Sequence, residues 1–214
     1  MLHHLYGILE RSPLASRLPE AGIDDRPVLV RRLGGLVVLS TLVDVTPRPS
    51  PWAVGRHHDV LMGAVTPGPL FPLRFGVGVP LGEMETWLAA RAGILRAGLR
   101  SVRGKVEMRV RVLSLHVRDG DAPRLQEIAD RVATAACVPN WRGRVSGSGA
   151  NAAVALSFLV PRADVSPFLS RIAPVMSRAV DVAVVPSGPW PPFTFVPALD
   201  SPLVAAASAV PHAV

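Results

Sequence analysis

Few residues of this chain combine the type and spacing that chemistry requires. His57-His58-Asp59 is the densest group of titratable side chains, and it could suggest a metal site or an acid–base pair. Adjacent residues on a helix point in different directions, however, and no third ligand follows at helical spacing. We therefore expect these side chains to face solvent or to pair with neighbours, and we predict no metal site.

Two other features could suggest chemistry but lack what it needs. Cys137 is the only cysteine, which excludes an internal disulfide framework and a multi-cysteine metal site. No neighbouring histidine could activate its thiol, so we expect it to be inert. The glycine-rich segment 143–149 lacks the Lys-Ser/Thr ending of a phosphate-binding loop, and it predicts a hairpin turn. The sequence therefore predicts neither an enzyme nor a cofactor.

Arg74 is the one charge in the apolar run 70–76. Such a run predicts a strand, in which Arg74 would be buried or half-buried. An unpaired buried charge is costly, so a carboxylate or backbone carbonyls should pair with it. This predicts a structural role for Arg74, with partner binding as the alternative.

The segment 187–196, Ser-Gly-Pro-Trp-Pro-Pro-Phe-Thr-Phe-Val, carries three aromatic side chains on a backbone stiffened by proline. Proline fixes φ and extends the residue before it, so we expect an ordered arm that lies against the body of the protein. Trp190, Phe193 and Phe195 then need an apolar partner. That partner is either the core of this protein or the surface of another one.

Composition narrows the class of protein. Of the 214 residues, 49% are hydrophobic and 18% are charged, which indicates a globular protein and excludes general disorder. No apolar run reaches the roughly 20 residues that span a bilayer, and the N-terminus lacks a signal-peptide pattern, so we expect a cytoplasmic protein without a membrane anchor. The formal charge of +7 is spread along the chain, and such diffuse basicity is weak support for nucleic-acid binding.

Hydrophobic periodicity predicts two successive groups of elements. In the first half it predicts a strand at 2–9, a hairpin of strands 28–32 and 36–43 around Gly34-Gly35, a helix capped by Ser50, the strand 70–76, and a long helix from Val79-Pro80 to about Val102. The second half predicts strand 104–112, a helix after the turn 119–121, strands 141–145 and 152–160 around a turn at 147–149, helix 164–178 and strand 180–185. This order, β-α-β-β-α-β, is typical of the ferredoxin-like fold.

The predicted class is therefore α+β, with two α/β domains of which the C-terminal one is ferredoxin-like. We predict an N-terminal domain at 1–78, a linking helix at 79–103, a C-terminal domain with its aromatic arm at 104–198, and a loosely ordered tail at 199–214. A nucleic-acid-binding ferredoxin-like module is the alternative function. The strand from Lys105 to Arg111 has basic residues on its polar side, but it has no aromatic platform there and Glu107 interrupts the charge.

Six short motifs in order resemble the gas vesicle protein F/L family over nearly the whole chain. They are Tyr6-Gly7-Ile8, the segment 58–61, Leu73-Arg74-Phe75-Gly76, Gly104-Lys105-Val106-Glu107, Asn151-Ala152-Ala153 with Phe158-Leu159-Val160, and Gly188-Pro189-Trp190-Pro191-Pro192-Phe193. The Gly-Pro-Trp-Pro-Pro-aromatic ending is the most specific of them.

The resemblance implies an accessory protein of gas vesicle formation, not an enzyme. Members of the family look like two-domain proteins that interact with the small amphipathic shell protein and with other accessory proteins, either to keep the shell protein soluble or to help nucleate the shell. It also implies a place in the cytoplasm and at the gas vesicle. The candidate partner-binding residues are Arg74, Trp190, Phe193 and Phe195, together with exposed sheet edges and grooves that could cover an apolar shell subunit.

Overall fold

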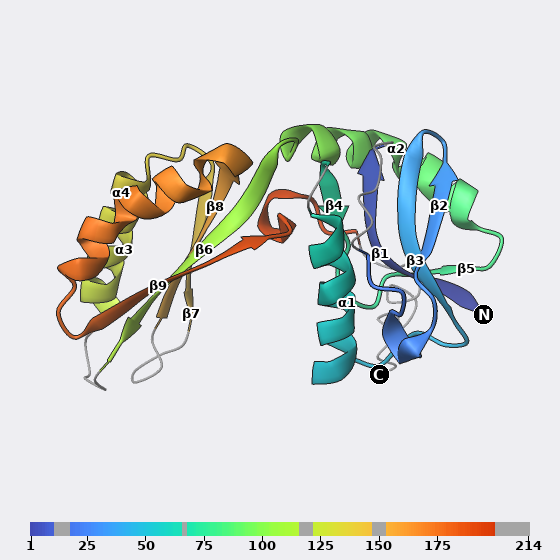
Figure 1. Cartoon of the computed structure of the whole chain (residues 1–214), viewed down its shortest axis with the longest axis horizontal. Coiled ribbons are helices and arrows are strands. Elements are labelled where there is room, and N and C mark those ends of the chain that lie inside the picture. The colour runs from blue at the N-terminus through green and yellow to red at the C-terminus, as the bar shows by residue number, and fades with distance from the viewer. Residues whose placement is uncertain (11–17, 66–67, 116–121, 147–152, 200–214) are drawn as a thin grey trace, which may run out of the picture. The chain divides into compact units, whose positions relative to one another are not determined.

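The computed structural model describes residues 1–10, 18–65, 68–115, 122–146 and 153–199 (Figure 1). The chain divides into two compact units. The first unit consists of Met1–Arg103 together with the segment that begins at Pro191, and the second is Gly104–Trp190. Each unit is built on one antiparallel sheet.

The sheet of the first unit has the order β2-β3-β1-β4, and β5 also pairs with β1. Its strands are β1 (Leu2–Glu10), β2 (Leu29–Leu33), β3 (Leu36–Val43), β4 (Leu70–Pro72) and β5 (Gly78–Pro80). The predicted hairpin is confirmed: β2 and β3 pair around Gly34 and Gly35, which both have positive φ angles, 56° and 78°. Glycine adopts that conformation without the steric cost other residues have, and this permits a tight two-residue turn.

One predicted strand is wrong. The run 70–76 is not continuous, because β4 ends at Pro72 and a turn from Arg74 to Val77 separates it from β5. Gly76 has a φ of 92°, a conformation that interrupts a strand. The two short strands then pair with different parts of β1 on the same side of it.

Two helices complete the first unit: α1 (Pro51–Ala64) and α2 (Met84–Ser101). The predicted cap is confirmed, since the Ser50 side chain accepts a hydrogen bond of 3.1 Å from the Ala53 backbone N–H. Helix α2 begins later than predicted, because the residues up to Pro80 pair with β1 instead.

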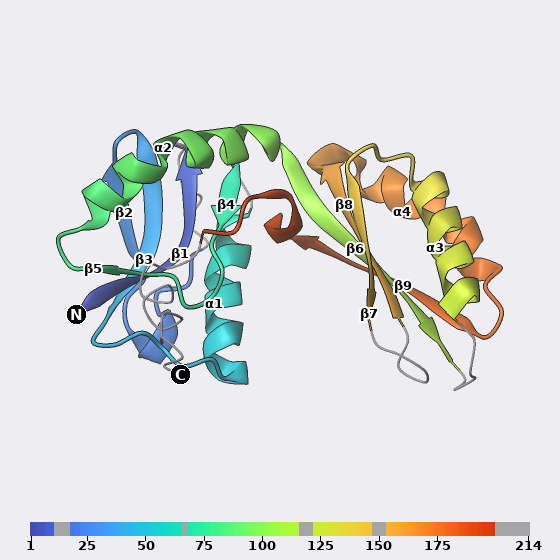
Figure 2. The same ribbon diagram turned by 180° about the vertical axis from the view of Figure 1, so that it is seen from behind.

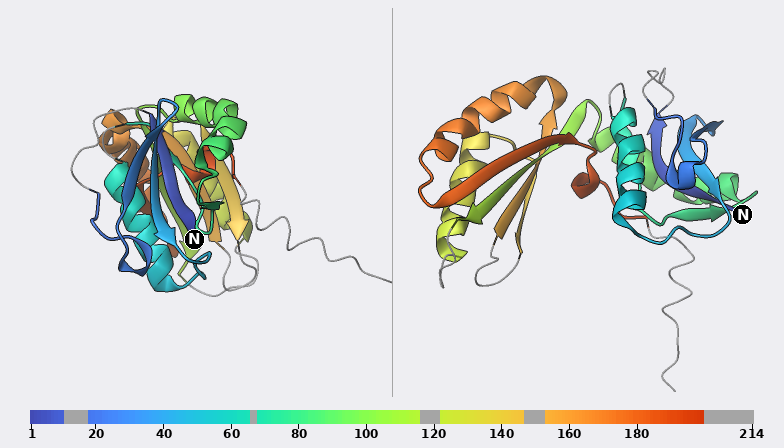
Figure 3. Two further views of the ribbon diagram at one scale, coloured as in Figure 1. Left: turned by 90° about the vertical axis from the view of Figure 1, so that its right-hand side faces the viewer. Right: turned by 60° about the horizontal axis from the view of Figure 1, so that its bottom comes forward.

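The two helices lie on opposite faces of this sheet (Figure 3). On β1, alternate residues point to opposite faces: His4 and Tyr6 lie against His57 of α1, whereas Leu5 packs in the core that α2 covers. That second core includes Phe71 and Leu95, both completely buried. The sheet is therefore buried on both faces, which explains why every residue of β1 from His3 to Leu9 is buried.

Gly98 of α2 allows Phe71 to approach the helix closely. A Cβ atom at Gly98 would lie 2.5 Å and 2.6 Å from two ring atoms of Phe71. In an open helix position Gly→Ala stabilises by up to about 1 kcal/mol, but overpacking costs about 1–3 kcal/mol. We expect Gly98→Ala to lower the free energy of unfolding by about 1–2 kcal/mol, measured by urea denaturation.

Gly93 is the matched control, since a Cβ atom there would meet nothing within 4 Å. Gly93→Ala should stabilise the protein by roughly 0.5–1 kcal/mol. Equal stabilisation by both substitutions would show that Phe71 can move away, contrary to this account.

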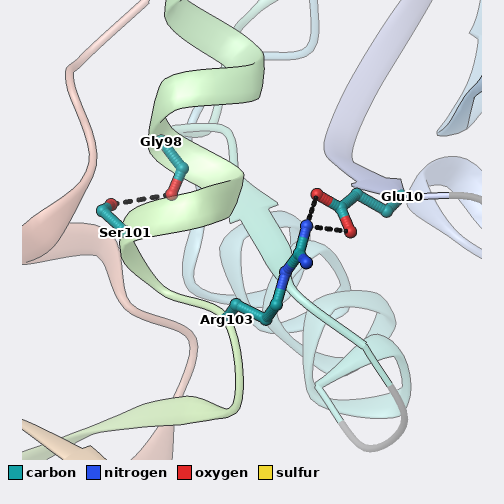
Figure 4. Close-up of polar contacts among 4 residues, drawn as sticks. All are labelled: Glu10, Gly98, Ser101 and Arg103. Atoms are coloured by element: carbon teal, nitrogen blue, oxygen red, sulfur yellow. Dashed lines mark hydrogen bonds and ion pairs between the residues drawn. The ribbon is translucent and has the colours of Figure 1, made fainter.

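The C-terminal end of α2 is fixed by two polar contacts (Figure 4). The Ser101 hydroxyl donates to the Gly98 carbonyl at 2.7 Å, and Arg103 Nη2 lies 2.6 Å and 2.8 Å from the two carboxylate oxygens of Glu10. The Arg103 side chain is 60% exposed, so the ion pair contributes at most about 1 kcal/mol. Its main effect is to join the end of α2 to the end of β1, one residue before the second unit begins at Gly104.

The second unit has the predicted β-α-β-β-α-β order. Its elements are β6 (Lys105–Ser114), α3 (Ala122–Ala136), β7 (Trp141–Ser146), β8 (Ala153–Pro161), α4 (Val165–Ser177) and β9 (Val182–Trp190). The sheet order β7-β8-β6-β9 is the ferredoxin-like arrangement, and it confirms the predicted fold. Helices α3 and α4 lie together on one face of the sheet (Figure 2).

The core of the second unit forms between this face and the two helices. The predicted inward residues of α3 are all buried: Leu125, Ile128, Ala129, Val132 and Ala136. On α4, Phe168 and Ile172 are buried as predicted, but Leu169 is exposed, because it falls on the outer side of the helix. The predicted turns at 119–121 and 147–149 lie outside the described residues.

The units differ from the predicted domain limits at two places. Helix α2 groups with the first unit instead of forming a separate link, because its apolar side packs in that unit's core. The segment after Pro191, placed in the C-terminal domain by sequence, also groups with the first unit. Val196 and Leu199 pack in the same core as α2, which explains this grouping.

Candidate partner-binding surfaces

Arg74 lies in the turn between β4 and β5, and it is exposed. The prediction of a buried or half-buried cation is therefore wrong, because the chain leaves the sheet at this point. The next residue, Phe75, is half-buried instead and lies against the rings of His4 and His57. The turn thus holds an aromatic side chain inward and presents a positive charge to solvent.

The first part of the predicted arm is a strand. Residues up to Trp190 belong to β9, and Trp190 pairs with Glu107 of β6 after an irregularity in the register. The Trp190 ring is half-buried, and its Nε1–H donates to the Ser187 hydroxyl at 3.1 Å. Trp190 therefore extends the sheet, where the sequence had predicted a separate arm.

The second part of the arm forms a short 3-10 helix, η4 (Phe193–Phe195). Both phenylalanines are half-buried. Because Leu199 is buried in the core of the first unit, this segment is held to that unit at its far end. The aromatic side chains are thus partly packed within the protein and partly accessible.

His57 and His58 point to different environments, as expected for adjacent helical residues. His57 is buried, and its Nε2–H donates to the Leu73 carbonyl at 2.9 Å. Its Nδ1 must then accept, and it lies 2.9 Å from Nε2 of the completely buried His4. Sequence reasoning missed His4, which lies 53 residues away in the chain.

Burial keeps both rings neutral. Desolvation is the largest cause that lowers the pKa of His4 to about 3, and repulsion from His57, once that ring is protonated at low pH, is a smaller cause. Desolvation is also the largest cause that lowers the pKa of His57 to about 4, opposed by its hydrogen bond to the Leu73 carbonyl. Two neutral, buried imidazoles with backbone and aromatic neighbours hold the sheet and α1 together.

No metal site is found within the described ranges, where no three His, Cys, Asp or Glu side chains are arranged to hold an ion. In the same part of the chain, no helix is long and apolar enough to cross a membrane. Cys137 is exposed and its thiol donates weakly to the Thr134 carbonyl at 3.5 Å.

Strand β7 is an edge of the second sheet and presents apolar side chains. Trp141 is 38% exposed and Val145 is 57% exposed. An edge strand offers unpaired backbone groups to another chain, and exposed apolar residues on it favour association. Arg142 and Arg144 alternate with these residues, an arrangement that keeps an edge soluble in the absence of a partner.

The face of the second sheet that α3 and α4 leave uncovered is strongly basic. Residues paired across neighbouring strands point to the same face, so the register defines two rows on this open face. One row is Arg142, Ser157, Arg109 and Ser187, and the next is Arg144, Ala155, Arg111 and Val185. All four arginines are exposed.

Glu107 lies on the same face of β6 but is completely buried. Its Oε1 accepts from Arg109 Nε at 2.6 Å and from the Ser157 hydroxyl at 3.1 Å. The sequence predicted a strand with one solvent-facing side, and Glu107 is the exception. A buried carboxylate is stabilised by such charge-assisted hydrogen bonds.

A groove of about 510 Å³ lies in the first unit, between the β2–β3 hairpin and α2. Its lining is mostly apolar, with Glu85 and Arg96 among the residues: Leu33, Gly34, Leu36, Glu85, Leu88, Ala89, Ala92 and Arg96. It is a second apolar surface that a partner segment could occupy.

Comparison with known proteins decides the family. A sequence model described as "Gas vesicle synthesis protein GvpL/GvpF" matches residues 2–135 and 115–197. The chain belongs to the GvpL/GvpF family. This confirms the resemblance seen in the six short motifs.

The structure of this GvpL/GvpF family member is similar to two crystal structures of the gas vesicle protein GvpF. The match to GvpF of Anabaena sp. PCC7120 has a TM-score of 0.74 and 16% identity, and covers 94% of this chain and 98% of that one. The match to GvpF of Microcystis aeruginosa has the same TM-score and identity, and covers 91% and 98%. At this identity the likeness shows a shared fold. No curated protein matches the chain in sequence.

The most specific of the family-like motifs has a clear structural role in this chain. Gly188 has a φ of 123°, and a Cβ atom there would lie 2.9 Å from the Glu107 carbonyl oxygen. Glycine at this position lets β9 approach β6 where the register changes, and Trp190 then pairs with Glu107. In this GvpL/GvpF family member, the motif therefore shapes the end of the open face.

Proposed function

We propose that this protein is an accessory protein of gas vesicle assembly, acting in the cytoplasm and at the vesicle. It binds the small shell protein and other accessory proteins while the vesicle forms. Membership of the GvpL/GvpF family, matched over residues 2–197 in two overlapping segments, is the observation that carries this proposal. The match covers both units, so the role belongs to the whole chain.

The geometry supplies physical means for such binding. An apolar shell subunit aggregates unless its surface is covered, and strand edges and apolar grooves can cover it. The β7 edge offers both an open side for strand pairing and exposed apolar side chains at Trp141 and Val145. The groove beside α2 offers a second apolar surface.

We expect no catalytic role. The buried histidine pair is held neutral and is turned toward backbone and aromatic groups, which leaves it without access to a substrate. General acid–base catalysis needs a group within reach of the substrate and with a pKa near the working pH. The family description, a gas vesicle synthesis protein, fits an assembly role.

The test is co-expression of the intact chain with the small gas vesicle shell protein, followed by affinity purification. We expect the shell protein to be retained and a larger share of it to stay in solution. Val145→Lys should reduce retention several-fold, since it places a charge on the apolar edge. The control is Val180→Lys, at a position 68% exposed and outside the sheet. Failure of the intact chain to retain the shell protein would contradict the proposal.

Arg74, Trp190, Phe193 and Phe195 are proposed as further partner contacts. Arg74 gives the cleanest test, because it is exposed and Arg74→Ala should leave the fold intact. Deleting the chain from Ser187 onward would instead remove half of β9 and the core residue Leu199. If the Arg74→Ala variant retains as much shell protein as the unchanged chain does, Arg74 is not part of the binding surface.

A further inference from the structure

In the four strands of the second sheet, all positively charged residues lie on one face. Their basic residues are Lys105, Arg109, Arg111, Arg142 and Arg144, and the register places all of them on the open face. The only acidic residue in these strands is Glu107, which is buried and paired with Arg109. The opposite face is apolar and covered by α3 and α4. The open face therefore has a net positive charge concentrated at its surface.

The arginines form two flanks with a low floor between them. Arg142 and Arg144 stand on β7, Arg109 and Arg111 stand on β6, and β8 runs between these strands. Neighbouring strands are about 4.8 Å apart, so the flanks are separated by roughly 9.6 Å. On β8 the open face carries only small side chains between them, Ala155 and Ser157. This separation between the two arginine-bearing strands is close to the diameter of an α-helix, about 10 Å.

The spacing of the arginines along each strand also matches a helix. Successive arginines on one strand are two residues apart, which corresponds to about 6.6 Å. Residues i and i+4 on one side of a helix are separated by about 6 Å along its axis. Carboxylates at that spacing on both sides of a helix could each face a guanidinium, which binds carboxylates in a planar, bidentate manner.

We infer that this open face binds an amphipathic helix with acidic flanks, presented by a partner protein. The small or apolar stripe of that helix lies over Ala155 and Ser157, and its carboxylates face Arg142 and Arg144 on one side and Arg109 and Arg111 on the other. The inference rests on the proposed accessory function, and it adds the chemistry and the place of one partner contact.

A protein partner fits this face better than a nucleic acid does. Ferredoxin-like sheets that bind RNA stack bases on aromatic residues of the open face. On β6, β7 and β8 the residues of this face include no aromatic side chain, and Trp190 lies at the end of β9, half-buried and bonded to Ser187.

The experiment uses the full chain and a fluorescent 20-residue peptide, helical by design, with an Ala/Leu stripe flanked by glutamates at i and i+4. We expect it to bind at least about tenfold more tightly than the same peptide with glutamines, and more weakly as salt is raised. Arg111→Gln with Arg144→Gln should weaken binding about tenfold. The control, Arg131→Gln with Arg178→Gln, removes the same charge from exposed positions outside the sheet and should change binding less than about twofold.

Three results would overturn the inference. They are no preference for the glutamate peptide, an equal loss in both double variants, or tighter binding of a 20-nucleotide single-stranded RNA that depends on Arg111 and Arg144. Each of them leaves the assembly function standing if the shell protein still copurifies with the intact chain. Loss of copurification together with intact peptide binding would instead contradict the assembly function alone.

Discussion

Acidification from pH 7 to pH 5 should destabilise the first unit by roughly 4 kcal/mol, because His4 and His57 must stay neutral in the fold. Burial lowers their pKa values from 6.5 to about 3 and about 4. The unfolded chain binds protons at these rings below about pH 6.5, whereas the folded chain does not. Stability is therefore complete above pH 6.5, and it falls as the pH drops toward 4. Each histidine contributes roughly 2 kcal/mol of this loss at pH 5.

Hydrogen exchange of β1 and β3 amides in urea, measured at pH 7, 6 and 5, reports the stability of the first unit alone. The variant His4→Gln with His57→Gln should show a much smaller pH dependence, whatever its stability at pH 7. His58→Gln, which removes a half-buried neighbour on the same helix, should keep the wild-type slope. A wild-type slope in the double variant would contradict the account. His3, whose pKa is lowered by burial and by Arg31, remains in every variant.

The ferredoxin-like half was predictable because local periodicity and tertiary structure agree there. Apolar and polar residues alternate along Lys105–Ser114, which predicts a strand, and the core residues of α3 recur at helical spacing, which predicts a helix. Burial of these apolar residues in the hydrophobic core requires the same two elements. The hairpin at Gly34-Gly35 was predictable for the same reason, since its turn chemistry is local.

The proline-rich segment 187–196 is an example in which a prediction from local sequence was wrong for part of the segment. Proline fixes φ, extends the residue before it and lacks a backbone N–H, and the stiff, extended backbone predicted an arm against the body of the protein. Strand β9, however, is at an edge of its sheet, where a missing backbone N–H toward solvent carries little cost. Pro186 and Pro189 therefore lie in β9 and the sheet continues to Trp190.

The histidine pair and the basic open face depend on tertiary contacts between distant residues, which local sequence patterns do not predict. His4 lies in an apolar run, and only the fold brings it to His57. The basic side of β6 was visible in the sequence, but Arg142 and Arg144 join it only through the register of β7 with β8. Gly76, a glycine inside an apolar run, is a local sequence signal that could have separated β4 from β5, and its positive φ in the structure is the reason. With that break, the exposure of Arg74 would have been predicted.

Arg109→Met should lower the free energy of unfolding of the second unit by about 2–3 kcal/mol, because it removes a charged partner that lies 2.6 Å from the buried Glu107 carboxylate. Breaking a buried ion pair costs about 3–5 kcal/mol, and the value is reduced here because the Arg109 side chain is 44% exposed and its charge is partly screened. Urea denaturation measures this loss. Arg111→Met, two residues further along the same face, is the matched control and should cost less than about 0.5 kcal/mol.

Glu107→Gln in the Arg109→Met background should recover at least half of the lost stability, since a neutral amide can still accept from the Ser157 hydroxyl. This recovery separates the burial of a charge from the loss of packing by the arginine stem, which Gln cannot restore. Equal effects of Arg109→Met and Arg111→Met, without recovery, would show that Glu107 is stabilised by its other contacts. Arg109 would then be a surface charge like its neighbours, and all four arginines of the open face would be equally available to an acidic partner.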